Sequence, residues 1–263
     1  MTRAKLEDFG DRLIVTATNG ARRNALTPDY YATLAEALEQ ARDPRIAAVI
    51  LCGEGGYFCA GGDLTQLATR RELPEPERLA RIEALHDLIR GVIACPAPVI
   101  AAVEGGAAGA GASLAFACDL VVADRAASFS AAYVKAGLVP DGGLTTSLAR
   151  LVPRATLMRM ALFGEKIPAT RLHELGVVSQ LEDAADVFPA ALALADRLAD
   201  GPTGAQTAIK RLVTSAYDSD AATQLDRERD AMAAAVAAPE AAEGIGAFLD
   251  KRTPDFRTAR EGR

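Results

Sequence analysis

The sequence is poor in histidine and cysteine, the side chains that most often bind transition metals. It has only two histidines, His86 and His173, among 263 residues, and neither has a second histidine at helical spacing. The four cysteines form no CxxC pair and are flanked by apolar residues: Cys52, Cys59, Cys95 and Cys118. We therefore expect no metal site, four small buried thiols in a reducing compartment, and structural roles for both histidines.

The sequence also lacks long apolar runs and clusters of basic residues. No apolar stretch reaches the roughly 18 residues that a membrane-spanning helix needs, and residues 1–11 lack the apolar core of a signal peptide. The net charge is −6 and the pI is about 5.1, with basic residues scattered along the chain. This distribution argues against nucleic acid or a membrane as a partner and favours a cytoplasmic location.

Two glycine-rich stretches are the most informative features, at residues 58–64 (FCAGGDL) and 105–112 (GGAAGAGA). Each follows a β-branched apolar run that is typical of a buried strand. Because glycine has no Cβ, such loops can bring backbone N–H groups close to a ligand, and two N–H donors aimed at one oxygen form an oxyanion hole. The alternatives are tight packing at strand–helix turns, or a nucleotide-binding loop. A nucleotide-binding loop is the less favoured alternative, because residues 106–111 do not match the GxGxxG motif in register.

The first half of the chain alternates predicted strands with predicted helices, and the second half is mainly helical. Thr27 and Pro28 are expected to begin the first helix, as its N-cap and its first-turn proline. A polar, mobile stretch is expected at residues 69–77, followed by a helix whose buried face carries Leu79, Ile82, Leu85 and Ile89. Strands are predicted at residues 12–18, 46–51, 99–103, 119–123 and 177–180. This pattern indicates an α/β core and a helical cap or oligomerisation layer.

Taken together, the motifs of this chain resemble those of the enoyl-CoA hydratase/isomerase (crotonase) superfamily over nearly the whole length. The pattern is most similar to the phenylacetate-pathway-type enoyl-CoA isomerases. The motifs are residues 22–26 (RRNAL), 58–64, 102–111 (AVEGGAAGAG), 118–119, 137–143 (GLVPDGG), 172–178 (LHELGVV) and 243–256 (EGIGAFLDKRTPDF). Their order and spacing make the resemblance specific.

The resemblance implies an α/β fold in which residues 1–200 form a crotonase-like spiral of ββα turns that holds an acyl-CoA site. Residues 201–263 would form a C-terminal helical region that mediates trimerisation, with a trimer and a dimer of trimers both open. The ligand implied is an acyl-CoA thioester. No cofactor is expected, because coenzyme A is part of that substrate.

The resemblance also implies roles for individual residues. The two oxyanion-hole N–H groups would belong to Gly62 and Ala110, and a helix dipole would strengthen the donor at Ala110. These N–H groups would stabilise the enolate that forms when a proton is removed next to the thioester carbonyl. Residues expected around the CoA nucleotide are Arg22, Arg23, Ala60, Asp63 and Leu64. Residues expected to contact CoA from a neighbouring subunit are Phe248 and Lys251.

The chain departs from the hydratase pattern at the two positions where that pattern has catalytic carboxylates. Ser113 and Tyr133 stand there, and we expect them to line the substrate pocket. Neither is a suitable base at neutral pH, since a tyrosine has a pKa of about 10. Asp141 is the carboxylate that remains near the site by motif. It is either the N-cap of the helix that follows, or an acid/base that moves a proton along the acyl chain.

Three functional hypotheses follow from these residues. The favoured one is an enoyl-CoA isomerase that uses Asp141 as its acid/base. The second is another acyl-CoA reaction, either hydratase-like chemistry (a lyase) or attack by Asp141 in a hydrolase or dehalogenase. No histidine lies near either glycine-rich loop in the sequence, and this disfavours a dehalogenase. The third is a protein that binds acyl-CoA without catalysis.

Overall fold

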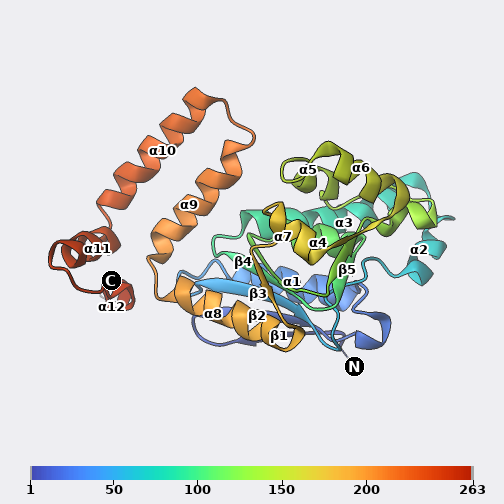
Figure 1. The fold of residues 1–263 in the computed structure, drawn as a ribbon, viewed down its shortest axis with the longest axis horizontal. Helices are drawn as coiled ribbons and strands as arrows, with labels where there is room; N and C mark the ends of the chain where they lie inside the picture. Colours follow the sequence, from blue (N-terminus) through green and yellow to red (C-terminus); the bar gives the residue numbers. More distant parts are fainter. Residues whose placement is uncertain (1, 262–263) are drawn as a thin grey trace.

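The body of the molecule is built on two β-sheets, which the computed structural model describes together with the rest of residues 2–261 (Figure 1). The larger sheet has the strand order β1-β2-β3-β4-β6-β9. β1 runs antiparallel to β2, and the other neighbouring strands are parallel. Its strands are β1 (Ala4–Asp8), β2 (Arg12–Ala17), β3 (Ala48–Gly53), β4 (Val99–Val103), β6 (Leu120–Asp124) and β9 (Gln180–Glu182).

The smaller sheet has the order β5-β7-β8, with β5 and β7 parallel and β7 and β8 antiparallel. Its strands are β5 (Gly106–Ala108), β7 (Ser128–Ser130) and β8 (Lys166–Pro168). β5 lies inside the second glycine-rich stretch and leads into helix α4 (Ala110–Ala117), whose residues are all buried. The chain therefore passes from one sheet to the other at this stretch.

Helices cover both sheets and form the C-terminal end. The long helices of the body are α1 (Pro28–Gln40), α3 (Glu75–Ala94), α6 (Arg154–Phe163) and α8 (Val187–Ala199). The short ones are α2 (Leu64–Arg70), α5 (Leu144–Ala149) and α7 (Ala169–Glu174), with 3-10 turns at Gly20–Arg22, Ala132–Ala136 and Ala184–Asp186. The C-terminal helices are α9 (Thr203–Ala216), α10 (Ala221–Val236), α11 (Pro239–Leu249) and α12 (Phe256–Glu261).

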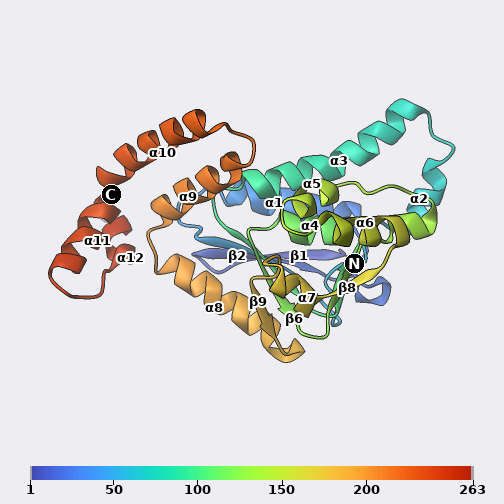
Figure 2. The same cartoon turned by 45° about the horizontal axis from the view of Figure 1, so that its top comes forward.

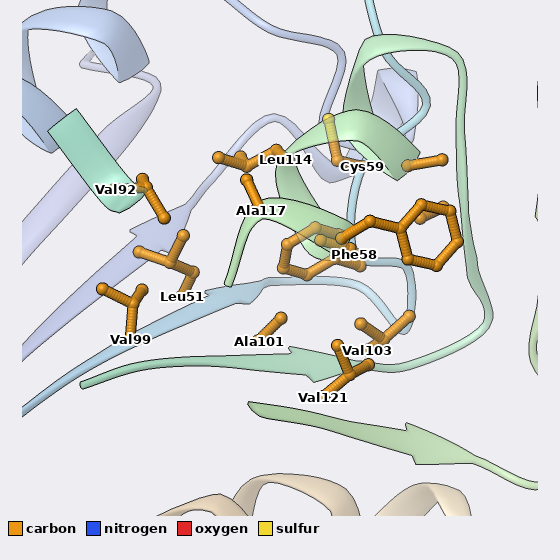
Figure 3. Packing of buried hydrophobic residues seen from close by; sticks show 14 of the residues in the cluster. Leu51, Phe58, Cys59, Val92, Val99, Ala101, Val103, Leu114, Ala117 and Val121 are labelled. Carbon is orange, nitrogen blue, oxygen red and sulfur yellow. The ribbon is translucent and has the colours of Figure 1, made fainter. Parts of the chain in front are cut away.

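Alternate residues of the parallel strands point to opposite faces of the larger sheet, as a period of two requires. On β4, the side chains of Val99, Ala101 and Val103 join the cluster beneath α4, where Figure 3 shows them facing Leu114 and Ala117. The residues between them enter a second cluster on the other face. Both faces are thus buried, and this explains why these strands read as continuous apolar runs.

Helix α8 covers the second face of the sheet, opposite α1, α3 and α4 (Figure 2). Val187, Ala191, Ala195 and Ala199 recur every four residues along it and are fully buried. Spacing of four places these side chains in one row, and alanine lets the helix lie close to the strands.

Helix α1 begins as the sequence predicts. Thr27 is its N-cap and accepts a hydrogen bond from the Tyr30 N–H at 3.2 Å, and Pro28 follows in the first turn. Thr27→Ala is expected to lower the free energy of unfolding by about 1 kcal/mol, because a buried N–H loses its acceptor. Chemical denaturation measures this loss. Thr27→Ser keeps a hydroxyl acceptor and is the control; an equal loss in both variants would contradict the capping role.

The C-terminal helices extend away from the body, as Figures 1 and 2 show from two directions. α10 has no buried residue, and α9 buries only Lys210. The Lys210 ammonium lies 2.6 Å from the Asp119 carboxylate and donates to the carbonyl oxygens of Val92 and Ala97. Burial raises the pKa of Asp119 more than Lys210 lowers it. This ion pair joins the middle of α9 to the body.

Three sequence predictions need correction, and the others agree within a few residues. The short strand expected at 177–180 is β9, at Gln180–Glu182. The polar stretch at 69–77, after which the helix is expected to begin, contains the end of α2 and the start of α3. On α3, Leu85 and Ile89 are buried as expected, but Leu79 is 60% and Ile82 is 37% exposed. The first turns of α3 extend beyond the core (Figure 2).

Within residues 2–261, no single helix is long and apolar enough to cross a membrane. Helices α10 and α11 together have the length and composition of a membrane span, but they are bent by 75° where they meet.

Candidate active site

The two glycine-rich stretches lie against each other. The Ala108 N–H donates to the Cys59 carbonyl oxygen at 2.9 Å, and Cys59 forms an isolated parallel bridge with Ala107. The approach is close at Gly61, whose φ is +89°: a Cβ there would lie 2.6 Å from the Ala108 oxygen and 3.0 Å from the Ala110 nitrogen. Only glycine fits this contact, because a side chain would meet backbone atoms that cannot move independently.

The N–H groups predicted as oxyanion donors are both unused within the part of the chain that the structure describes. Gly62 is exposed and donates no hydrogen bond to any described residue. Ala110 is the first residue of α4, where a backbone N–H has no intrahelical acceptor. The positive end of the helix dipole coincides with this N–H. Both donors therefore remain available to a ligand oxygen.

The residues predicted around the CoA nucleotide come together at the start of α2. The Arg22 guanidinium lies 2.7 Å from an Asp63 oxygen, and the Ala60 N–H donates to the Arg23 carbonyl at 2.9 Å. Asp63 is also the N-cap of α2, where its side chain accepts a hydrogen bond from the Thr65 N–H. This bond and the nearby Arg22 hold the pKa of the Asp63 carboxyl below its ordinary value. The predicted CoA contact Leu64, the first residue of α2, is 63% exposed.

A network of hydroxyl groups surrounds the remaining carboxylate. The Tyr133 hydroxyl donates to Asp141 Oδ1 at 2.8 Å, and it lies 3.0 Å from the Ser113 hydroxyl. Ser113 is fully buried and donates to the Asp141 backbone carbonyl at 2.8 Å. Burial and the charge of Asp141 raise the pKa of Tyr133 well above its ordinary value. Tyr133 is therefore a hydrogen-bond donor here and not a base.

Asp141 does not cap the helix that follows it. Helix α5 begins after Gly143, whose φ is +76°, and it has no side-chain cap. The Leu144 N–H instead bonds the backbone carbonyl of Asp141, at 3.3 Å. Asp141 Oδ1 accepts from Tyr133, and Oδ2 has no hydrogen-bond partner among the described residues. The geometry therefore excludes the interpretation of Asp141 as a helix cap.

The loop that carries Asp141 is held tightly against α4 and α3. Gly142 has a φ of +60°, and a Cβ there would lie 2.9 Å from the Ser113 Cβ and 3.3 Å from a Leu85 methyl group. On helix α1, burial raises the pKa of Tyr31 to about 12, and the charge of Asp141 raises it further while that of Arg70 lowers it. Contacts with α4 and α3 thus fix the loop beside the carboxylate.

Phe248 and Lys251 do not join this site within one chain. Phe248 is 83% exposed on α11, and Lys251 is exposed just after that helix. Figures 1 and 2 place α11 at the end of the molecule opposite to α2. Their predicted contact with CoA therefore requires a second subunit and stays a prediction.

Two of the four cysteines expected to be buried are buried, Cys59 and Cys95, while Cys52 and Cys118 are half-buried. Burial raises the pKa of Cys59 to about 12. Nδ1 of His173 lies 2.8 Å from the Val178 carbonyl oxygen, and His86 lies near Glu83 on α3. Among residues 2–261, no group of three or more His, Cys, Asp or Glu side chains is placed to hold a metal ion.

Sequence reasoning placed Ser113 and Tyr133 in the substrate pocket but missed that they bond to Asp141. It also missed Gly61, which makes the closest contact between the two loops. The sequence shows that residue 61 is a glycine, but it does not show that its φ is positive. The hydroxyl network joins residues from a helix, a 3-10 turn and a loop, and no local pattern connects them.

Comparison with known proteins shows similarity along the whole chain. The profile described as enoyl-CoA hydratase/isomerase matches residues 13–259. The chain is 39% identical to 1,2-epoxyphenylacetyl-CoA isomerase of Escherichia coli, over 93% of this chain and 94% of that protein. It is 37% identical to a probable enoyl-CoA hydratase of Rhodobacter capsulatus, over 92% and 90%. The crystal structure of an enoyl-CoA hydratase from Polaromonas superposes with a TM-score of 0.91 at 45% identity, over 95% and 98%.

Proposed function

The chain belongs to the enoyl-CoA hydratase/isomerase family, and on that premise we propose that it is an enoyl-CoA isomerase, which shifts a double bond along the acyl chain of a CoA thioester. Asp141 moves the proton, and the N–H groups of Gly62 and Ala110 hold the thioester oxygen. Coenzyme A enters as part of the substrate. The similar proteins include a 1,2-epoxyphenylacetyl-CoA isomerase and a probable enoyl-CoA hydratase, so the choice of a double-bond shift rests on the residues around Asp141.

One observation carries the proposal: Asp141 has one carboxylate oxygen bonded to Tyr133 and one without a partner in the described chain. A carboxylate used only as a helix cap would bond N–H groups of its own helix, and this one does not. A half-buried carboxylate with a free oxygen can accept a proton from a bound ligand. A single such group suffices when the proton is later returned to the same molecule.

The reaction needs two proton transfers. Oδ2 of Asp141 takes a proton from the α-carbon of a 3-enoyl thioester, and the electron pair of that C–H bond delocalises onto the thioester oxygen as a dienolate. The Gly62 and Ala110 N–H groups stabilise the charge on this oxygen. The carboxylic acid then gives the proton to the γ-carbon, and the double bond moves to the 2-position. Asp141 is again a carboxylate at the end.

Addition of water is disfavoured by the same residues. Hydration needs groups that hold and deprotonate a water molecule, and the positions in question carry Ser113 and Tyr133. Tyr133 keeps its proton because burial and the Asp141 charge raise its pKa. Ser113 uses its hydroxyl to bond the Asp141 carbonyl. Neither side chain can accept a proton from water at neutral pH.

The rest of the ligand is assigned by position. We place the CoA nucleotide at Arg22, Arg23, Ala60, Asp63 and Leu64, where the start of α2 meets the 3-10 turn before α1. Phe248 and Lys251 would reach it from a neighbouring subunit in a homotrimer or a dimer of trimers. Their exposure, and their distance from α2 in Figure 1, fit a contact made across subunits.

Product identification tests the proposed function. The protein is incubated with 3-enoyl-CoA and with 2-enoyl-CoA thioesters. The products are separated by chromatography, and their masses are measured by mass spectrometry. We expect the 3-enoyl thioester to become its 2-enoyl isomer with no change in mass. A product heavier by one water would show hydration, and free CoA would show hydrolysis; either as the main product contradicts the proposal. Tight acyl-CoA binding without turnover would instead show a non-catalytic binding protein.

A further inference from the structure

The hydroxyl pair beside Asp141 has a geometry that ordinary pocket packing does not require. Tyr133 bonds Oδ1 of the carboxylate, and Ser113 bonds the backbone carbonyl of the same residue. The two hydroxyls also lie 3.0 Å from each other. Asp141 is therefore held at its side chain and at its backbone by one connected pair of groups.

The hydrogen atoms of this network can be counted. Each hydroxyl has one hydrogen to donate. The Tyr133 hydrogen lies on the 2.8 Å contact with Asp141 Oδ1, which has no hydrogen of its own when ionised. The Ser113 hydrogen lies on the contact with the Asp141 carbonyl or with the Tyr133 oxygen. The Tyr133 hydrogen thus points toward Oδ1, the Ser113 hydrogen points toward Asp141 or toward Tyr133, and Oδ2 is left without a donor among the described residues.

The same two residues connect the carboxylate to the second glycine-rich loop. Ser113 lies one turn after Ala110 on α4, and a Cβ on Gly109 would lie 3.9 Å from the ring of Tyr133. A helix turn fixes the relative positions of residues three apart. The N–H donor at Ala110 and the hydroxyl that holds Asp141 therefore belong to one rigid unit.

We propose that Tyr133, supported by Ser113, is a positioning residue that reserves Oδ1 of Asp141 for the protein and leaves Oδ2 as the one atom that carries the substrate proton. This inference rests on the proposed isomerase function. With Oδ1 occupied, the carboxyl group does not turn between the two proton transfers. The proton taken from one carbon then returns to the other before it exchanges with solvent.

Tyr133→Phe tests the inference, because it removes the hydroxyl and keeps the ring that packs beside Gly109. With a substrate deuterated at the abstracted carbon, we expect kcat to fall about 10- to 100-fold and KM to change by less than about twofold, the range for losing a hydrogen bond to a charged group. The fraction of deuterium carried into the product should fall as solvent protons replace it. A role in packing alone would not move this fraction.

Two further variants separate the explanations. Ser113→Ala removes the support but keeps Tyr133, so it should lower the deuterium carried over in the same direction and by less. Tyr31→Phe is the matched control: its hydroxyl makes no hydrogen bond among the described residues, although the charge of Asp141 acts on it. We expect Tyr31→Phe to behave as the wild type.

The outcomes of the Asp141→Asn and Tyr133→Phe variants are distinguishable. Loss of turnover in Asp141→Asn together with less deuterium carryover in Tyr133→Phe supports the inference. Loss in Asp141→Asn with a wild-type Tyr133→Phe overturns the inference and leaves the isomerase function intact. Wild-type turnover in Asp141→Asn overturns both.

Discussion

Replacing Asp141 with asparagine is expected to lower kcat for double-bond migration by about 10²- to 10⁴-fold, the usual contribution of a general acid or base. Asparagine keeps the size of the side chain, and its amide oxygen can still accept the hydrogen bond from Tyr133. What it removes is the free oxygen, Oδ2, which has no partner within the described chain. Binding of the thioester should change little, because the substitution leaves the two N–H donors and the start of α2 unaltered.

Steady-state kinetics and calorimetric titration with an unreactive acyl-CoA measure the two effects separately. Glu104→Gln is the control, since Glu104 is the half-buried carboxylate beside the second glycine-rich loop, where burial raises its pKa. We expect this variant to keep its activity. An equal loss in both variants would mean that the site responds to any removal of charge, and retention of activity in Asp141→Asn would remove Asp141 from the mechanism.

Gly61→Ala is expected to reduce kcat by about 10²- to 10³-fold, as the loss of an oxyanion donor does. The added Cβ would lie 2.6 Å from the Ala108 oxygen and 3.0 Å from the Ala110 nitrogen, so the backbone must shift on one side. The φ of +89° adds strain for any residue with a Cβ. The shift would move the N–H groups of Gly62 and Ala110 apart. Asp141 is not touched.

Gly56→Ala provides the comparison for strain alone. Its φ is +71°, close to that of Gly61, but an added Cβ there would meet no atom within 4 Å. Thermal unfolding should show a small loss of stability in Gly56→Ala, from backbone strain, and a larger one in Gly61→Ala, where the contact with backbone atoms adds to the strain. Only Gly61→Ala should lose turnover, measured with the same 3-enoyl thioester. If Gly56→Ala loses as much, the contact between the loops has no special role in catalysis.

The fold class followed from the sequence because its causes are local. Buried parallel strands such as β3 and β4 must be apolar on both faces, so they are visible as uninterrupted runs of β-branched residues. The resemblance to the enoyl-CoA hydratase/isomerase family, confirmed by the match to residues 13–259, supplied the order of the ββα turns and the helical C-terminal region. The exposed start of α3 was not predictable, since periodicity shows which face is apolar but not what covers it.

The candidate site residues could be proposed one by one from the sequence, but their contacts could not. The glycines and Asp141 could be singled out because each stands in a recognisable motif. The bond from Tyr133 to Asp141 could not, because it depends on where a 3-10 turn and a loop meet in space. A sequence also does not distinguish an aspartate that caps a helix from one that lies just before an uncapped helix. The free oxygen of Asp141 is therefore a result of the structure alone.

The crowding around Ser113 has a consequence for how this enzyme could evolve. Ser113 is fully buried, its hydroxyl is 2.8 Å from the Asp141 carbonyl, and Gly142 leaves no room for a Cβ beside it. A glutamate at position 113 would displace the loop that carries Asp141 before it could hold a water molecule. A mutational path from this protein to a glutamate-dependent hydratase therefore cannot begin with that single substitution. The loop at 137–143 must change first, and each intermediate along the path risks losing the position of Asp141 without gaining a site for water.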